Sequence, residues 1–344
     1  MIAVLSRPPA ASGKSIQNIL IIRPGGIGDA VLLIPAIIAL KNAYPHACIS
    51  VLAEKRNSAI FSLCPEVDAI FNYDKPAEIF AVLRGTYDVV IDTEQWHRLS
   101  AVVARCLRAT QSIGFATNER KKLFTHAIGY SHDAYEVRSF KELLTPLMGT
   151  VSANPDANFL MIPTDAARHA TQMLESFSGK RVVALFPGGS IPERRWGSDR
   201  FHILAQLLMK RGYAVVVVGG DDDRESGAEI TRNLGINAIT LCGKSSLIET
   251  AAVLQEAAIL ISGDSGILHI GYGLGIKTVA LFGPGIEIKW APRGKNHVAI
   301  NKNLSCSPCT KFGYTPHCKN DAACMKQISA AEVYSAAITL LEGY

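Results

Sequence analysis

Short β-branched runs alternate with longer helical patterns along the chain, and this alternation limits the fold more than any other feature. The strands expected in the first half are four apolar runs, at residues 19–22, 49–53, 69–72 and 88–92. The helices expected there lie at residues 29–42, near Ser58, at 98–108 and at 135–148, with a less regular stretch at 113–130. This rhythm predicts βαβ units and a parallel sheet.

A second series of the same kind follows residues 154–163, which carry two prolines and several small polar residues. Its expected strands lie at residues 182–186, 214–218, 238–241, 258–262 and 278–282. Its expected helices lie at residues 199–210, 224–234, 247–256, 266–274 and 330–342. The composition of residues 154–163 is that of a connector between packed units.

The chain is therefore expected to be an α/β protein with two Rossmann-like, doubly wound domains that face each other across a cleft. We expect a flexible extension at 1–17, a first domain at 18–154, a second at 155–328 and a final helix within 329–344. In doubly wound sheets, ligands bind outside the carboxyl ends of the strands. The chemistry is expected in that cleft.

Composition narrows the class of protein. Charged residues make up only 19% of the 344 residues, as expected for strands buried on both faces. The net charge of +5 suits anionic ligands, but no basic tail indicates nucleic acid. We find no apolar run long enough for a membrane span and no secretory signal in the first 17 residues. With several cysteines in apolar segments, these features favour a cytoplasmic protein.

Residues 23–29, Arg-Pro-Gly-Gly-Ile-Gly-Asp, leave a strand and open a helix. Gly25, Gly26 and Gly28 allow close approach of a phosphate or an acceptor to the backbone. Asp29 is either a carboxylate that faces the cleft or a first-turn acid that favours the helix dipole. As a dinucleotide fingerprint the turn is defective, because Val31 stands where a third small residue is required.

The turn at residues 263–269 repeats this arrangement in the second half. Asp264 is expected to accept hydrogen bonds from sugar hydroxyls, or else to be only an N-cap. The backbone amides of Ser265, Gly266 and Ile267 are expected to bind a diphosphate at the helix start. By contrast, Pro8–Ser15 ends like a nucleotide-triphosphate loop but precedes the first strand, so we expect no phosphate there.

Two further strand ends carry candidate residues. The loop of Gly188, Gly189 and Ser190 is followed by Arg194 and Arg195, whose guanidinium groups suit a departing phosphate unless the loop is merely solvated. The other loop places acids at the start of a helix, where an acid could hold a ribose diol or simply favour the helix start. The candidates there are Asp222 and Asp223.

Together, and in this order, these segments resemble bacterial glycosyltransferase family 9, the ADP-heptose:lipopolysaccharide heptosyltransferases. The resemblance spans nearly the whole chain from Ile19. It rests on RPGGIGDAVLLIP at 23–35, FPGGSIPERRW at 186–196, residues 215–220 and GDSGILHIGYGLGIKTVALFGP at 263–284.

The resemblance implies a GT-B architecture, with the acceptor on the first domain, the sugar nucleotide on the second and the final helix packed back on the first. It implies inverting transfer that requires no metal, with Asp29 as the base, Asp264 on the donor sugar and residues 265–267 on the diphosphate. The implied partners are an ADP-sugar and a lipopolysaccharide inner-core or related glycolipid acceptor, met at the cytoplasmic face of the inner membrane by peripheral association.

Two clusters remain open. Four cysteines fall within the loop 306–324, a density typical of a structural zinc site, a cluster, disulfides or free thiols: Cys306, Cys309, Cys318 and Cys324. The basic run Arg120-Lys121-Lys122 is either a solvated face or a contact for an anionic acceptor.

Three functional hypotheses follow. The first is a sugar-nucleotide-dependent transferase, which the resemblance favours. The second is a nicotinamide-dependent oxidoreductase that uses the turn from Gly25 to Asp29. The third is a non-catalytic nucleotide-binding module.

Overall fold

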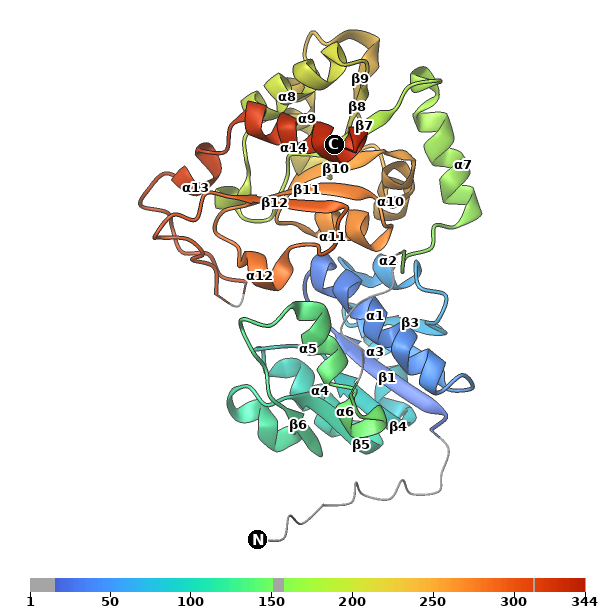
Figure 1. Ribbon diagram of the computed structural model, residues 1–344. Helices are drawn as coiled ribbons and strands as arrows, with labels where there is room; N and C mark the ends of the chain where they lie inside the picture. Colours follow the sequence, from blue (N-terminus) through green and yellow to red (C-terminus); the bar gives the residue numbers. More distant parts are fainter. Residues whose placement is uncertain (1–15, 151–157, 312, 344) are drawn as a thin grey trace.

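The computed structural model describes residues 16–150, 158–311 and 313–343. These residues form two lobes, each built on a six-stranded parallel sheet with helices on both faces (Figure 1). The segment Pro8–Ser15 lies outside the described residues. The two facing, doubly wound domains confirm the α/β fold and the GT-B architecture that the resemblance implied.

The first sheet has the strand order β3-β2-β1-β4-β5-β6. Its strands are β1 (Asn18–Arg23), β2 (Cys48–Ala53), β3 (Ala69–Asn72), β4 (Thr86–Asp92), β5 (Arg108–Phe115) and β6 (His126–Ile128). The helices of this lobe are α1 (Ile27–Ala43), α2 (Ser58–Phe61), α3 (Pro76–Arg84), α4 (Leu99–Cys106), the 3-10 helix η1 (Asn118–Leu123), α5 (Glu136–Glu142) and α6 (Thr145–Met148).

The second sheet, β12-β11-β10-β7-β8-β9, has the same topology as the first. Its strands are β7 (Val182–Phe186), β8 (Ala214–Val217), β9 (Ala238–Thr240), β10 (Ile259–Gly263), β11 (Lys277–Phe282) and β12 (His297–Asn301). Its α-helices are α7 (Thr164–Met173), α8 (Ser198–Lys210), α9 (Arg224–Thr231), α10 (Leu247–Glu256), α11 (Gly266–Gly273), α12 (Glu287–Trp290), α13 (Ala323–Lys326) and α14 (Ala330–Glu342). Short 3-10 turns are η2 (Glu175–Phe177), η3 (Pro192–Arg194), η4 (Asp221–Asp223) and η5 (Gly235–Asn237).

Local sequence explains where the strands and helices form. Strands β7 and β10 are buried along their whole length, which is why they read as uninterrupted apolar runs. Helix α10 begins with a capping box, in which Ser246 accepts from the Glu249 amide and Glu249 accepts from the Ser246 amide. The start of helix α11 is the expected diphosphate site. The Ser265 hydroxyl caps this helix by accepting a hydrogen bond from the Leu268 amide.

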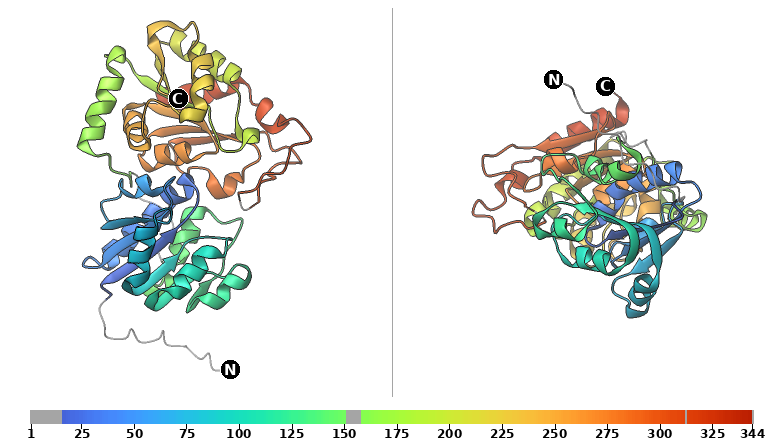
Figure 2. Two further views of the ribbon diagram at one scale, coloured as in Figure 1. Left: turned by 180° about the vertical axis from the view of Figure 1, so that it is seen from behind. Right: turned by 90° about the horizontal axis from the view of Figure 1, so that it is seen from below.

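The strand order of the two sheets brings the turn at residues 23–29 and the turn at residues 263–269 close together. Strand order reverses between β1 and β4 in one sheet and between β7 and β10 in the other. The loops at these two reversal points face each other, with α11 and α12 lying over α1, α2 and α5 (Figure 1, Figure 2). The contact is close, since a β-carbon at Gly266 would stand 2.7 Å from Cβ of Ile27. Glycine at 266 therefore lets the two helix starts meet.

Two expectations about the fold are wrong. The stretch 113–130, expected to be irregular, contains the end of β5, the 3-10 helix η1 and strand β6. The final helix α14 does not pack back on the first domain. It packs on α8 and the second sheet instead, where its buried side chains Val333, Ala337 and Leu341 join the core of the second lobe (Figure 1).

Among the helices and strands that the structure describes, five more were not anticipated: α3, α7, α12, α13 and β12. In the part of the chain that the structure describes, no helix combines the length and the apolar character needed to cross a bilayer.

Candidate active site between the two domains

Asp29 lies in the first turn of α1, at the carboxyl end of β1. Its Oδ1 atom accepts a hydrogen bond of 2.9 Å from Nε2 of Gln95 and lies 3.8 Å from Nη1 of Arg23. The Asp29 side chain remains 23% exposed. The carboxylate is thus held through one oxygen, and its side chain remains partly exposed at the point where the two domains meet.

A buried polar cluster at the end of β4 supports Asp29. The guanidinium of Arg23 donates to the Thr93 carbonyl at 2.9 Å and to Glu94 at 3.1 Å. Burial acts to raise the pKa of Glu94, but the charge of Arg23 and the amides of residues 96 and 97 hold that pKa below its usual value. Arg23 therefore places a buried guanidinium group 3.8 Å from Asp29 and fixes it by hydrogen bonds to the segment after β4.

A second carboxylate, Glu136, stands behind Gln95. Its Oε1 atom accepts from Nε2 of Gln95 at 2.8 Å, and its Oε2 atom lies 2.7 Å from Nζ of Lys289. Glu136 belongs to the first domain, whereas Lys289 lies in α12 of the second. Burial raises the pKa of Glu136, and the ammonium of Lys289 opposes that rise.

His269, on α11, occupies the contact between the domains. Its ring is buried, and burial lowers its pKa, so the imidazole is neutral at physiological pH. Asp264, Asp29 and Arg194 are the charged groups close enough to influence it. His269 therefore lies among the expected base on the first domain and the expected donor-binding pair on the second.

Arg194 and Asp264 form an ion pair, with Nη1 2.9 Å from Oδ2. The contact is an ion pair, and no hydrogen bond to Asp264 Oδ2 accompanies it. In the regions that the structure describes, three buried polar atoms around this point have no hydrogen-bond partner: Nε of Arg194, Oδ2 of Asp264 and Nδ1 of His269. Buried polar atoms without hydrogen-bond partners are uncommon in protein interiors. They are expected at sites where a bound polar ligand supplies the missing hydrogen bonds.

The glycine loop after β7 lies close to Arg195 and Asp223. Arg195 is exposed, and its Nε donates to the Gly189 carbonyl at 2.9 Å. Asp223 is buried against Gly188 and Gly219, where its Oδ2 accepts from the Gly220 amide at 2.9 Å. Its pKa is raised by burial. Asp223 thus shapes the loop, which leaves the exposed Asp222 as the more accessible of the two candidates for a ribose.

The basic run 120–122 divides into two parts. The guanidinium of Arg120 is fully buried and pairs with Asp92 at 2.8 Å, so it cannot reach an acceptor at the surface. The expected contact of Arg120 with an anionic acceptor is therefore wrong, because its positive charge is already paired with the buried carboxylate of Asp92 at the end of β4. Lys121 and Lys122 are exposed, and Lys122 pairs with Glu119.

None of the four clustered cysteines forms a disulfide bond within the described ranges. Burial raises the pKa of Cys309 and of Cys324, and the neighbouring thiols of the same loop act in the same direction. No group of three or more His, Cys, Asp or Glu side chains arranged to hold a metal is found over the described ranges. A structural zinc in this loop stays a prediction.

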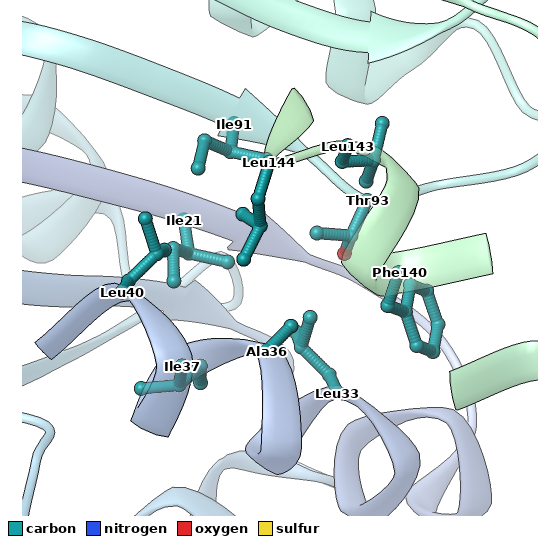
Figure 3. A pocket seen from close by; sticks show the side chains of 10 residues that line it. All are labelled: Ile21, Leu33, Ala36, Ile37, Leu40, Ile91, Thr93, Phe140, Leu143 and Leu144. Carbon is teal, nitrogen blue, oxygen red and sulfur yellow. The ribbon is translucent and has the colours of Figure 1, made fainter. Parts of the chain in front are cut away.

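A small cavity of about 10 Å³ lies inside the first domain (Figure 3). Its lining is apolar apart from Thr93 and comes from β1, α1, β4 and α5, with Leu33, Ile37 and Phe140 among its side chains. A space of this size holds one water molecule at most. It belongs to the packing of the core.

Sequence reasoning missed five residues of the site: Arg23, Gln95, Glu136, His269 and Lys289. A signal was present for one of them, because the polar run Asp92-Thr93-Glu94-Gln95 directly follows an apolar strand at the point where strand order reverses. His269 lay within a quoted motif but had no assigned role. Nothing in the sequence pairs Glu136 with Lys289.

Comparison with known proteins identifies the family of the chain. The model of glycosyltransferase family 9 (heptosyltransferase) matches residues 78–318. Lipopolysaccharide heptosyltransferase 3 of Escherichia coli is 29% identical over 291 residues, covering 78% of this chain and 83% of that protein.

Two solved structures share the fold. A glycosyl transferase family 9 protein from Veillonella parvula superposes with a TM-score of 0.80 at 20% identity, covering 96% of this chain and 99% of the other. An E. coli heptosyltransferase with ADP-2-deoxy-2-fluoro heptose gives a TM-score of 0.72 at 19% identity, covering 93% and 99%.

Proposed function

The chain belongs to glycosyltransferase family 9, and from this premise we propose that it transfers a heptose from ADP-heptose to a lipopolysaccharide core acceptor. Membership of the family decides for the transferase over the oxidoreductase and the non-catalytic module. The family relative in E. coli is named for heptose transfer, and a structural neighbour was solved with an ADP-heptose analogue. The protein is an enzyme, and its reaction is glycosyl transfer.

The observation that carries the proposed mechanism is the position of Asp29. Gln95 holds its Oδ1 atom, while the side chain stays partly open between the domains. We assign Oδ2 of Asp29 as the general base that takes the proton of the acceptor hydroxyl. The acceptor oxygen then forms a bond to the anomeric carbon from the face opposite the leaving group. The bond from that carbon to the diphosphate oxygen breaks, so ADP leaves with the electron pair and the configuration inverts.

The donor is assigned to the second domain. The amides of Ser265, Gly266 and Ile267 at the start of α11 suit the diphosphate, as do Arg194 and Arg195. Asp264 suits the hydroxyls of the sugar, and the unpaired atoms of Arg194, Asp264 and His269 are where donor groups would complete the hydrogen bonding. Because arginines and helix amides supply the positive potential, the proposed reaction requires no divalent metal.

We assign the acceptor site and the membrane-binding surface to the first domain. The loop after Gln95 and helix α4 expose Trp96, Leu99 and Val102, with Leu99 69% exposed. Basic residues of helix α4, its N-cap and the adjoining η1 are exposed as well: Arg98, Arg105, Lys121 and Lys122. Apolar side chains among basic ones are typical of a surface that lies on anionic lipid. We propose that this face associates peripherally with the cytoplasmic face of the inner membrane, where a glycolipid acceptor would be presented.

One experiment tests the reaction. Purified protein is assayed for ADP release from ADP-heptose with truncated lipopolysaccharide acceptors, and the product is examined for the configuration of the new bond. An α-linked product from a β-linked donor, or the reverse, is expected. Retained configuration would refute the single-displacement mechanism, and failure to release ADP with any inner-core acceptor would refute the substrate assignment.

The membrane face has its own test. Sedimentation with vesicles containing phosphatidylglycerol is compared for the wild type and Leu99→Asp/Val102→Asp, and Ile236→Asp is the control because Ile236 is 80% exposed on the second domain. Loss of vesicle binding in the double variant alone is expected. Equal binding of all three proteins would refute this surface.

A further inference from the structure

Lys289 is carried by the second domain, but the hydrogen-bond partners of its ammonium group, among the residues that the structure describes, belong to the first. Its Nζ atom lies 2.7 Å from Oε2 of Glu136 and donates to the carbonyls of Ser131 at 3.0 Å and Ala134 at 3.3 Å. The same atom stands 4.4 Å from the centre of the Tyr130 ring. The segment 130–136 is thus a socket that accounts for all three ammonium hydrogens.

The pair is buried on both sides, with Lys289 only 2% exposed and Glu136 fully covered. Removing each ion from water costs several kcal/mol, so a buried pair of this kind adds little to stability compared with apolar side chains of similar size. When the domains separate, both ions regain water. The contact is therefore suited to a reversible association of the two domains.

A single amide connects this socket to Asp29. Nε2 of Gln95 carries two hydrogens, and they go to Oε1 of Glu136 at 2.8 Å and to Oδ1 of Asp29 at 2.9 Å. The opposite end of the amide, Oε1, faces Nη1 and Nη2 of Arg23 at 3.4 Å. Both ends of the Gln95 amide are therefore held in orientation. Arg23 holds the oxygen end, and Glu136 helps to hold the nitrogen end that contacts Asp29.

We propose that Lys289 is a positioning residue that makes domain closure a condition for orienting Asp29. When α12 docks, the ammonium enters the socket and allows Glu136 to be buried as an anion, and Glu136 orients Asp29 through Gln95. In this role Lys289 touches no substrate. The inference rests on the proposed function for the identity of Asp29 as the base.

The test compares Lys289→Met with Lys289→Met/Glu136→Gln. The single variant leaves a carboxylate without a cation whenever the domains close. The double variant removes both charges, and the amide oxygen at 136 can still accept from Gln95. We expect kcat for ADP release to fall about 10- to 100-fold in the single variant, the scale of a misplaced catalytic group. We expect it to recover to within threefold of wild type in the double variant, with KM for the donor nearly constant throughout.

Solution scattering with saturating ADP provides a readout that does not depend on chemistry. The single variant is expected to have a larger radius of gyration than the wild type, and the double variant is expected to return to the wild-type value. Lys302→Met is the control, because Lys302 pairs with Glu332 inside the second domain. Circular dichroism checks that each variant is folded.

The outcomes separate this inference from the proposed function. A single variant with a lower melting temperature but unchanged kcat and unchanged scattering would overturn the role of Lys289 and leave Asp29 untouched. Failure of the double variant to recover kcat would also overturn it. If Asp29→Asn remains active, the base assignment fails, and the scattering comparison still decides whether Lys289 holds the domains closed.

Discussion

A β-carbon at Gly28 would stand 2.6 Å from Cδ2 of His269, in space that the buried imidazole ring occupies. Gly28 lies in the first turn of α1, and His269 lies in α11 of the other domain. Since β-carbons essentially never approach other atoms so closely, the two domains can meet in this arrangement only with glycine at 28. Glycine here therefore serves the contact between the domains.

We expect Gly28→Ala to lower turnover at least tenfold, because the added methyl group pushes His269 and α11 away from α1. Gly220→Ala is the matched control, since a β-carbon at 220 meets no atom within 4 Å. Steady-state ADP release provides the measurement. Combining Gly28→Ala with His269→Ala should relieve the clash and restore the compactness of the ADP complex in solution scattering. An active Gly28→Ala enzyme would show that the domains work without this contact.

The sequence rhythm predicted both sheets because strands that are buried on both faces read as continuous apolar runs. It missed β5, whose sequence RATQSIGF is mainly polar over a half-exposed first half and has few apolar residues even at its buried end. The packing of α14 was wrong for another reason. Its apolar residues Val333 and Ala337 show that the helix is packed, but a stripe on one helix does not identify the surface that receives it.

The residues of the candidate site also fall into those that a local sequence pattern could identify and those that it could not. Asp29 and Asp264 could be found because each follows an apolar strand and opens a helix, a local pattern. Glu136 and Lys289 could not, because their pairing depends on how two domains close on each other. Arg120 was assigned wrongly because a run of basic residues is typical of an exposed surface. In the structure, the first side chain of the run 120–122 is buried and forms an ion pair with Asp92.

Asp29→Asn is expected to reduce transfer at least 100-fold, within the range that general-base catalysis contributes. The amide keeps an oxygen that can accept from Gln95, so the local structure should persist. Because the donor is assigned to the other domain, the affinity for ADP measured by calorimetry should stay within threefold of wild type. A tenfold loss of ADP affinity would assign Asp29 to donor binding instead.

Replacing both Arg194 and Arg195 with Ala should lower kcat about 100-fold, the scale seen when a preorganised group that stabilises developing charge is lost. The negative charge on the leaving diphosphate grows in the transition state, so kcat should change more than the donor KM. Arg232→Ala, an exposed position on the second domain, is the control. If kcat stays at the wild-type value in the double variant, the two arginines do not serve the leaving group.

Transfer is expected to survive dialysis against a strong chelator, since arginines and helix amides neutralise the diphosphate. Elemental analysis before and after dialysis reports any zinc held by the cysteine loop, and circular dichroism reports whether its removal unfolds the protein. Activity lost with an unchanged circular dichroism spectrum and restored by magnesium would refute the metal-free mechanism. Activity lost together with the fold would identify a structural metal.

His297 should make stability depend on pH. Burial lowers its pKa to about 4, and its Nδ1 atom lies 2.9 Å from the Thr278 hydroxyl. In the unfolded chain a histidine titrates near pH 6.5, so below that pH the unfolded state binds a proton that the folded state does not. Stability should fall as the pH drops from about 6.5 to about 4, by about 3 kcal/mol at most from this group.

The measurement is urea unfolding at pH 7.5 and at pH 4.5 for the wild type and for His297→Asn, in which the amide can still bond Thr278. The variant lacks the titrating ring, so its stability should fall less between the two pH values than that of the wild type. His46→Asn, at an exposed position, should behave as the wild type does. Because other groups titrate equally in all three proteins, the difference between the variants isolates His297, and parallel losses in all three would exclude it as a source of the acid sensitivity.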